Sequence, residues 1–366
     1  MKAALLAVLL LTACSRSAPP APAPTQSPPL PPSLIPGHGA LLGAYMDFGE
    51  KEDSVTFRGI QRFERLAGKA PAIIASSSYW GEQTFPTENT RLIAGHGAIP
   101  LIFWSPWDRP YEQNRGPDRF GLSEILAGKW DAYIDRWAEG ARAFGKPLLV
   151  SLGNEMNGSW FPWSGYFYGK STPVPGTPGG FQGPETFKKV WRHIVDRARA
   201  RGAANIRWVL HFNNYSYPTD GWNQMKNYYP GPDYVDWLGL SVYGKQFADD
   251  PWSKAVDLLD YPYREVCALD PDKPVMIAEF GIGEFPRDGD KSQWLTDMFS
   301  EIKKRSPRIR AAIFWHERWQ NEDGSFSNLR INSSLRALNA FRAAVADPFW
   351  IGNPQIPNEP ELSLAP

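Results

Sequence analysis

Two glutamates, Glu155 and Glu279, each follow a short apolar run. Glu155 comes after residues 147–152 (PLLVSL), and Glu279 comes directly after residues 275–278 (VMIA). An ionised carboxylate at the end of a buried strand is costly unless it is paired or used. Two carboxylates, one kept protonated to donate a proton and one ionised to attack, can hydrolyse a glycosidic bond. The alternative is that both close surface loops and form ordinary ion pairs.

The elements that must position these glutamates can be traced from eight short apolar runs. The runs cover residues 40–45, 71–76, 99–104, 147–152, 206–212, 235–242, 275–278 and 311–315. Amphipathic stretches with helical spacing lie at residues 129–144, 185–201, 291–304 and 335–345. Apolar strands that alternate with helices indicate a parallel sheet buried on both faces. We therefore predict an α/β protein with one (β/α)8 TIM barrel over residues 37–346, and a doubly wound open sheet is the alternative fold.

In a TIM barrel the active site lies at the carboxyl ends of the strands. Glu155 follows the fourth run and Glu279 the seventh, so both belong at the barrel mouth. The stretch from Glu155 to Trp163 (EMNGSWFPW) resembles the acid/base motif of glycoside hydrolase family 26. Residues 278–281 (AEFG) resemble the nucleophile motif of the same family, and the resemblance covers roughly residues 38–345.

This resemblance implies a retaining hydrolase that works by double displacement, with Glu155 as acid/base and Glu279 as nucleophile. The two carboxyl groups should then lie about 5–5.5 Å apart. Tyr243, at the end of the sixth run, matches a tyrosine that commonly binds the nucleophile. Trp315, which closes the eighth run, matches the tryptophan that floors the reactive sugar site in related families.

Asn154 departs from the family pattern. Mannan-cleaving members usually carry His immediately before the acid/base glutamate, whereas other families of the clan carry Asn, which bonds the 2-hydroxyl of the reactive sugar. The resemblance therefore implies an endo-acting hydrolase of β-1,4-mannan or β-1,3-1,4-glucan, and xylan is a further substrate within the family. A hydrolase of bacterial exopolysaccharide and a non-catalytic surface glycan-binding barrel are the alternatives.

The chain contains 16 tryptophans, more than an ordinary core needs. Aromatic rings stack on the apolar faces of sugars, so tryptophans at strand ends are candidate substrate contacts. They are Trp80, Trp104, Trp107, Trp160, Trp163, Trp222, Trp315 and Trp319. We expect Trp104, Trp160, Trp163 and Trp315 to bind substrate, together with His211 at the end of the fifth run. Packing in the barrel core is the alternative for each of them.

Other polar residues receive weaker assignments. Glu317 is a reserve carboxylate, ranked below Glu279 because it lacks the AEFG context. Asp47, Glu82 and Asp108 lie in predicted strand-to-helix loops and are candidates for contacts with distal sugars. The five histidines show no metal-ligand spacing, so we predict no metal and no cofactor.

The first residues have the pattern of an export signal. Met1 and Lys2 precede an apolar run at residues 3–11, which is too short to span a bilayer. The sequence Leu-Thr-Ala-Cys ending at Cys14 resembles a bacterial lipobox, and an ordinary cleavage site with an incidental cysteine is the alternative. We predict a signal peptide at residues 1–13 and a lipidated Cys14. Residues 14–36 would form a Pro-rich linker, and residues 347–366 an irregular Pro-rich tail.

The charge balance agrees with an uncharged partner. Lys and Arg number 39 and Asp and Glu number 39, so the chain lacks the basic excess of nucleic-acid binders. We expect a monomer that binds a polysaccharide or oligosaccharide and contacts the membrane only through the lipid on Cys14. The expected location is the cell surface or the outer membrane.

Overall fold

The computed structural model describes residues 34–48, 54–109 and 116–353. The predicted signal peptide, Cys14 and most of the linker lie outside the described residues. Within the described part, no helix is both long enough and apolar enough to cross a membrane.

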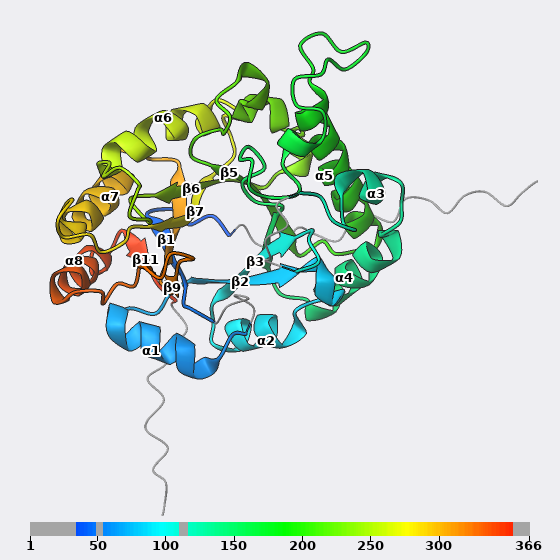
Figure 1. Ribbon diagram of the computed structural model, residues 1–366. Helices are drawn as coiled ribbons and strands as arrows, with labels where there is room; N and C mark the ends of the chain where they lie inside the picture. The colour runs from blue at the N-terminus through cyan, green and yellow to red at the C-terminus, as the bar shows by residue number, and fades with distance from the viewer. Residues whose placement is uncertain (1–33, 49–53, 110–115, 354–366) are drawn as a thin grey trace, which may run out of the picture.

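Eight parallel strands form one sheet that closes on itself (Figure 1). The first strand, β1 (Ala40–Tyr45), pairs with the last barrel strand, β8 (Ile309–Trp315), from Leu41 opposite Ala311 to Tyr45 opposite Trp315. An open sheet would leave these two strands as separate edges. The pairing therefore confirms the TIM barrel and excludes the doubly wound alternative.

The remaining barrel strands are β2 (Ile73–Tyr79), β3 (Ile99–Ser105), β4 (Leu148–Leu152), β5 (Ile206–Asn213), β6 (Trp237–Tyr243) and β7 (Val275–Gly281). Figure 1 shows the helices in a ring outside them: α1 (Phe57–Ala67), α2 (Thr87–Gly95), α3 (Leu122–Leu126), α4 (Asp131–Phe144), α5 (Gln182–Ala200), α6 (Ala255–Cys267), α7 (Lys291–Arg305) and α8 (Leu335–Val345). Single 3-10 turns lie in the loops at Trp80–Glu82, Gly165–Phe167, Gly221–Asn223, Met225–Tyr228 and Pro232–Tyr234. A small antiparallel hairpin, β9 (Arg318–Gln320) and β10 (Phe326–Asn328), follows β8.

The local sequence explains these elements. Every residue of β1 and β7 is buried, as expected for strands covered on both faces. Helix α5 places Phe187, Trp191 and Ile194 on its buried face, at the spacing that the sequence shows. Side-chain caps fix several helix starts; the hydroxyl of Ser334, for example, accepts a hydrogen bond from a backbone N–H in the first turn of α8.

Strand β7 is longer than the predicted run and contains an irregularity at its centre. Leu240 of β6 pairs with Ile277, but the next residue, Ser241, pairs with Glu279, so Ala278 is an extra residue in the register. Such bulges re-aim a side chain and are common beside active sites. Glu279 therefore lies within the strand, with its direction set by this bulge.

The start of the C-terminal segment is ordered, which corrects the prediction of an irregular tail from residue 347. Strand β11 (Trp350–Ile351) pairs in parallel with β1. Trp350 is buried and packs edge-on against Phe299 of α7, with ring centroids 4.9 Å apart. This aromatic anchor attaches the segment to the barrel in spite of the prolines around it. Residues 354–366 lie outside the described residues.

Candidate active site

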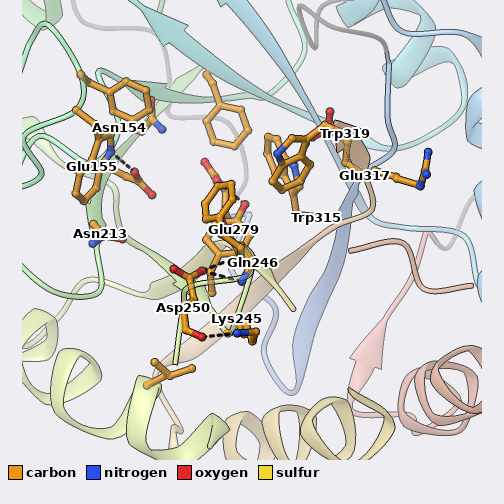
Figure 2. A pocket seen from close by; sticks show the side chains of 18 of the residues that line it. Asn154, Glu155, Asn213, Lys245, Gln246, Asp250, Glu279, Trp315, Glu317 and Trp319 are labelled. Carbon is orange, nitrogen blue, oxygen red and sulfur yellow. Dashed lines mark hydrogen bonds between the residues drawn. The ribbon is translucent and has the colours of Figure 1, made fainter. Parts of the chain in front are cut away.

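A cavity of about 1450 Å³ lies at the carboxyl ends of the barrel strands. Its wall includes Tyr243 and Trp315, the last residues of β6 and β8, and Glu155 just after β4. Figure 2 shows Asn154, Glu155, Glu279 and Trp315 among the side chains around it. The strand ends therefore bring both predicted catalytic glutamates to one cavity, as the barrel topology requires.

Glu155 is held in a constrained turn. Its φ is 54°, in the left-handed region that residues other than glycine seldom adopt, and such conformations gather at functional sites. Its backbone N–H donates to the carbonyl of His211 on β5, at 2.7 Å. The indole Nε1–H of Trp160 donates to its carboxylate oxygen Oε2 at 2.8 Å. The side chain is thus directed into the cavity by neighbours on both sides of the turn.

The surroundings of Glu155 favour its protonated form. Only 8% of the residue is exposed, and this burial raises the pKa of Glu155 above its usual range. Hydrogen bonds from Ser241 and Trp160 lower the pKa of Glu155, but by less than burial raises it. A carboxyl group with a raised pKa can carry a proton near neutral pH, which general acid catalysis requires.

Glu279 meets a different set of neighbours. The phenol of Tyr243 donates a hydrogen bond to its Oε2 at 2.7 Å. A donor at this distance stabilises an ionised carboxylate and fixes its orientation. The contact is the one expected for Tyr243 from the sequence.

Ser241 links the two carboxylates. Its side chain makes a hydrogen bond to Glu155, and its backbone is the register partner of Glu279 across the β6–β7 pair. One buried serine therefore contacts the carboxyl group of Glu155 and lies beside Glu279 in the sheet. Two carboxyl groups at one cavity, one of them with a raised pKa, are suited to paired acid and nucleophile chemistry.

Comparison with known proteins assigns the chain to a family. The sequence profile of glycosyl hydrolase family 26 matches residues 124–339, which is more than half of the chain. The chain belongs to glycosyl hydrolase family 26. The match includes the segments that carry Glu155, Tyr243 and Glu279.

Two curated relatives and one solved structure illustrate this family 26 resemblance. Endoglucanase H of Acetivibrio thermocellus is 28% identical over 84% of this chain and 30% of the relative. Mannan endo-1,4-beta-mannosidase A and B of Caldalkalibacillus mannanilyticus is 26% identical over 52% of this chain and 33% of the relative. The chain thus spans about a third of the length of these curated relatives. The structure of Bacillus subtilis mannanase man26 has the same fold, with a TM-score of 0.59, 20% identity, and coverage of 90% of this chain and 91% of that one.

His211 of the family 26 barrel lies beneath the cavity and does not line it, which corrects the prediction of a substrate contact. Its ring is fully buried between two serine hydroxyls, Ser151 at 3.0 Å from Nδ1 and Ser241 at 2.8 Å from Nε2. Burial lowers the pKa of His211 to about 3, so the imidazole is neutral at ordinary pH. His211 therefore acts as a core residue that positions Ser241.

Trp104 faces away from the cavity, so the prediction that it binds substrate is wrong. Its neighbours Phe103 and Ser105 line the cavity, and strand side chains alternate between faces. Trp104 is buried under the helix layer, where it stacks on Trp137 of α4 with ring centroids 3.9 Å apart. Its Nε1–H donates to the phenol oxygen of Tyr133 at 2.9 Å.

Trp163 is also a core residue, contrary to the prediction. It is fully buried, and its Nε1–H donates to the backbone carbonyl of Asn154 at 2.7 Å. Its ring stacks on Phe161, which does line the cavity. Trp163 thus holds the backbone beside Glu155 in place. Asn154 itself lines the cavity, as predicted.

Trp160 and Trp315 line the cavity, as predicted. Trp160 is 37% exposed, and Trp315 stacks on Tyr45 of β1 with ring centroids 4.0 Å apart. Among the other strand-end tryptophans, Trp107 and Trp319 line the cavity. Trp80 and Trp222 are buried and do not. The set of strand-end tryptophans is therefore divided between the cavity and the core.

Glu317 is a further carboxyl group in the cavity wall. It accepts a hydrogen bond from Nε1–H of Trp315 at 2.7 Å. The pKa of Glu317 is raised to about 7, chiefly by burial. The hydrogen bond from Trp315 lowers this pKa, whereas the negative charge of Asp47 raises it further. Asp47 also lines the cavity and forms an ion pair with Arg330.

The two other acidic residues predicted to reach distal sugars, Glu82 and Asp108, lie outside the cavity lining. Glu82 accepts a hydrogen bond from the phenol of Tyr79 at 3.0 Å, and Asp108 forms an ion pair with Arg119 at 2.5 Å. Each of these carboxylates is thus used within its own loop. Within the described ranges, no group of three or more His, Cys, Asp or Glu side chains has the arrangement of a metal centre.

The loop after β6 forms part of the cavity wall, which was not predicted from the sequence. Lys245, Gln246, Phe247 and Asp250 all line the cavity. The carboxylate of Asp250 accepts the backbone N–H groups of Gln246 and Phe247, each at 2.9 Å. The buried ammonium of Lys245 donates to two carbonyls of the same loop. An Asp four residues after Gln246 is a typical turn signal, but periodicity alone does not show that the loop folds over the cavity.

Proposed function

We propose that the protein is a retaining, endo-acting glycoside hydrolase that cleaves β-1,4-mannan or β-1,3-1,4-glucan by double displacement. The observation that carries the proposal is the pair of carboxyl groups, Glu155 and Glu279, that line one cavity at the carboxyl ends of the strands, with the pKa of Glu155 raised by burial. Membership in glycosyl hydrolase family 26 supports the same chemistry.

In the first step, a carboxylate oxygen of Glu279 attacks the anomeric carbon as the bond to the leaving oxygen breaks. Glu155 transfers its proton to that oxygen, so the shortened chain departs as a neutral alcohol. The raised pKa of Glu155 supplies the proton near neutral pH. Tyr243 keeps Glu279 oriented through the 2.7 Å hydrogen bond to Oε2.

In the second step, water attacks the anomeric carbon of the glycosyl-enzyme. Glu155, now ionised, takes one proton from the water while the bond to Glu279 breaks. Trp160 and Ser241 donate to the Glu155 carboxylate and stabilise it in this state. The cycle returns Glu155 to its protonated form and Glu279 to its ionised form.

The cavity supports a polymeric substrate. Its volume of about 1450 Å³ exceeds the 300–1,000 Å³ typical of small-molecule pockets. Aromatic side chains that line it remain partly exposed, with Trp160 at 37% and Phe247 at 43%. Ring faces that remain exposed at the cavity suit a chain that continues past the cleaved bond, which supports internal cleavage.

Asn154 supports β-glucan as one of the two candidate substrates. It lines the cavity beside Glu155, where it can meet the 2-hydroxyl of the reactive sugar. This hydroxyl is axial in mannose and equatorial in glucose, so its contact with Asn154 differs between the two polymers. One relative is named an endoglucanase and another a mannosidase, so both β-glucan and mannan are candidate substrates to test.

The decisive experiment measures reducing ends released from galactomannan, barley β-glucan, β-1,3-xylan and cellulose, with the Glu279→Ala variant as the blank. We expect wild-type cleavage of galactomannan or β-glucan and none by the variant. Inactivity of the wild type on all four polymers would overturn the proposal, as would activity that survives in Glu279→Ala.

We also propose that the chain is exported and anchored to a membrane by a lipid on Cys14. The support is the apolar run at residues 3–11 followed by the lipobox-like sequence. Expression of wild type and Cys14→Ser in a bacterial host, followed by detergent phase partitioning, tests this. The wild type should enter the detergent phase and the variant the aqueous phase; equal partitioning contradicts the anchor.

A further inference from the structure

An exposed tyrosine extends the aromatic wall of the cavity beyond Trp160. The ring of Tyr217 lies nearly parallel to that of Trp160, with an angle of 29° between planes and 6.5 Å between centroids. At this separation the rings are offset and do not cover each other's faces. Tyr217 is 62% exposed. The two rings together form a broad apolar surface, here called the Trp160–Tyr217 platform.

The backbone that carries Tyr217 is pinned to the turn that carries Glu155. The N–H of Tyr217 donates to the carbonyl of Asn157 at 2.8 Å. The buried side chain of Asn157 donates to the carbonyl of Asn213 at 3.0 Å and to the hydroxyl of Ser216 at 3.2 Å. Asn157 lies two residues after Glu155, so these hydrogen bonds hold the backbone of Tyr217 in place relative to the turn that carries Glu155.

An exposed apolar surface of two adjacent rings, one of which lines a cavity, is suited to a ligand contact. A second exposed pair, Tyr215 and Tyr261, offers a contrast within the same region. These rings are parallel at 6.4 Å, and the phenol of Tyr215 donates to the carbonyl of Asp257 at 2.8 Å. That hydrogen bond ties Tyr215 to α6. Tyr217 does not itself line the cavity, but it lies beside Trp160, which does. The Trp160–Tyr217 platform is the pair that continues from a cavity residue.

The chemistry indicates which end of the substrate meets the platform. Glu155 protonates the leaving oxygen, and Trp160 donates to Glu155, so Trp160 lies on the side of the departing chain. We propose that Tyr217 forms a further sugar-binding subsite for the departing chain, one position beyond the sugar nearest Trp160. This inference rests on the proposed function. The ligand is a β-linked, uncharged glycan whose apolar sugar face stacks on the tyrosine ring.

The test compares substrates that reach Tyr217 with one that does not. The long substrate is a six-sugar oligosaccharide of the polymer that the wild type cleaves. The short one is an aryl glycoside whose leaving group is a single phenol. Tyr217→Ala should lower kcat/KM on the long substrate about fivefold to tenfold and leave the aryl glycoside unchanged, as expected for one lost stacking contact. An equal loss on both substrates, or no loss on either, would overturn the inference.

Two variants serve as matched controls. Tyr217→Phe retains the ring and should behave as the wild type. Tyr261→Ala removes an exposed ring outside the cavity and should also leave both rates unchanged. Equal melting temperatures for all variants exclude a folding defect, because Tyr217 contributes little buried surface.

A binding measurement separates failure of this inference from failure of the proposed function. If the wild type hydrolyses no glycan, the proposed function fails. Titration calorimetry of six-sugar oligosaccharides of β-1,4-mannan and of β-1,3-1,4-glucan against Glu279→Ala and Glu279→Ala/Tyr217→Ala then tests the subsite by itself. Binding weaker by about fivefold in the double variant supports the subsite. Equal affinity of the two proteins overturns it.

Discussion

Replacing Glu317 by Gln should change how the stability of the barrel depends on pH. The pKa of Glu317 is raised from 4.5 to about 7, chiefly by burial. A carboxyl group that binds its proton more tightly in the folded chain makes folding less favourable as the pH rises between these two values. At about 1.4 kcal/mol per pKa unit, the rise corresponds to about 3 kcal/mol. Gln cannot ionise, yet its amide oxygen can still accept the hydrogen bond from Trp315.

The free energy of unfolding should be measured by urea titration at intervals from pH 4.5 to 8. Relative to Glu317→Gln, the wild type should lose about 3 kcal/mol across this range, and most of the loss should occur below pH 7. Glu322→Gln, at an exposed position between β9 and β10, is the control and should follow the wild type. Curves for wild type and Glu317→Gln that stay parallel within about 0.5 kcal/mol would refute the reasoning.

Three further predictions concern the residues around the catalytic pair. Tyr243→Phe removes the donor to Glu279, so kcat should fall about tenfold to a hundredfold with an unchanged melting temperature; an unchanged kcat would show that the contact is dispensable. Trp160→Phe removes a hydrogen bond that lowers the pKa of Glu155, so the alkaline limb of the pH–rate profile should move to higher pH. A shift to lower pH would contradict the assignment of Glu155 as the acid. Trp104→Ala should lower the free energy of unfolding by about 3–5 kcal/mol and leave KM unchanged under conditions where the protein is folded; a raised KM would restore Trp104 as a substrate contact.

Much of the fold could be predicted because its signals are local. Each barrel strand is a short apolar run, and helices such as α4, α5, α7 and α8 repeat apolar residues at helical spacing. Helices α1, α2, α3 and α6 lie outside the four stretches predicted to be helical. Helix α6 also contains Pro262, a residue that disfavours a helix interior. At Trp350 the prediction was wrong in the other direction. The composition of this segment indicates irregular structure, but the buried ring of Trp350 holds it in an ordered strand.

The sites of the candidate catalytic residues were also predictable, since they follow from strand order. Glu155 and Glu279 come at the ends of apolar runs, and a barrel brings all such ends to one mouth. Tyr243 ends the strand next to the one that carries Glu279. The positions of these residues along the chain therefore imply their proximity once the barrel is accepted.

Which aromatic residues face the cavity was decided by the tertiary structure. Phe103 and Trp104 are both apolar neighbours on β3, and only the strand register shows that Phe103 points inward and Trp104 outward. Trp163 lies in a turn, where no period applies, and its hydrogen bond to Asn154 buries it. The extra residue at Ala278, which directs Glu279, depends on pairing with β6.

The sequence by itself determined the barrel and the residues at its mouth, because hydrophobic period and strand order are properties of the chain. It also determined the family, through motifs that are each contiguous along the chain. Only the tertiary structure decided the protonation preferences and the inward or outward direction of each side chain. The physical reason is that pKa values and burial depend on neighbours far apart in sequence, as when Ser241 meets Glu155 and Asp47 lies near Glu317.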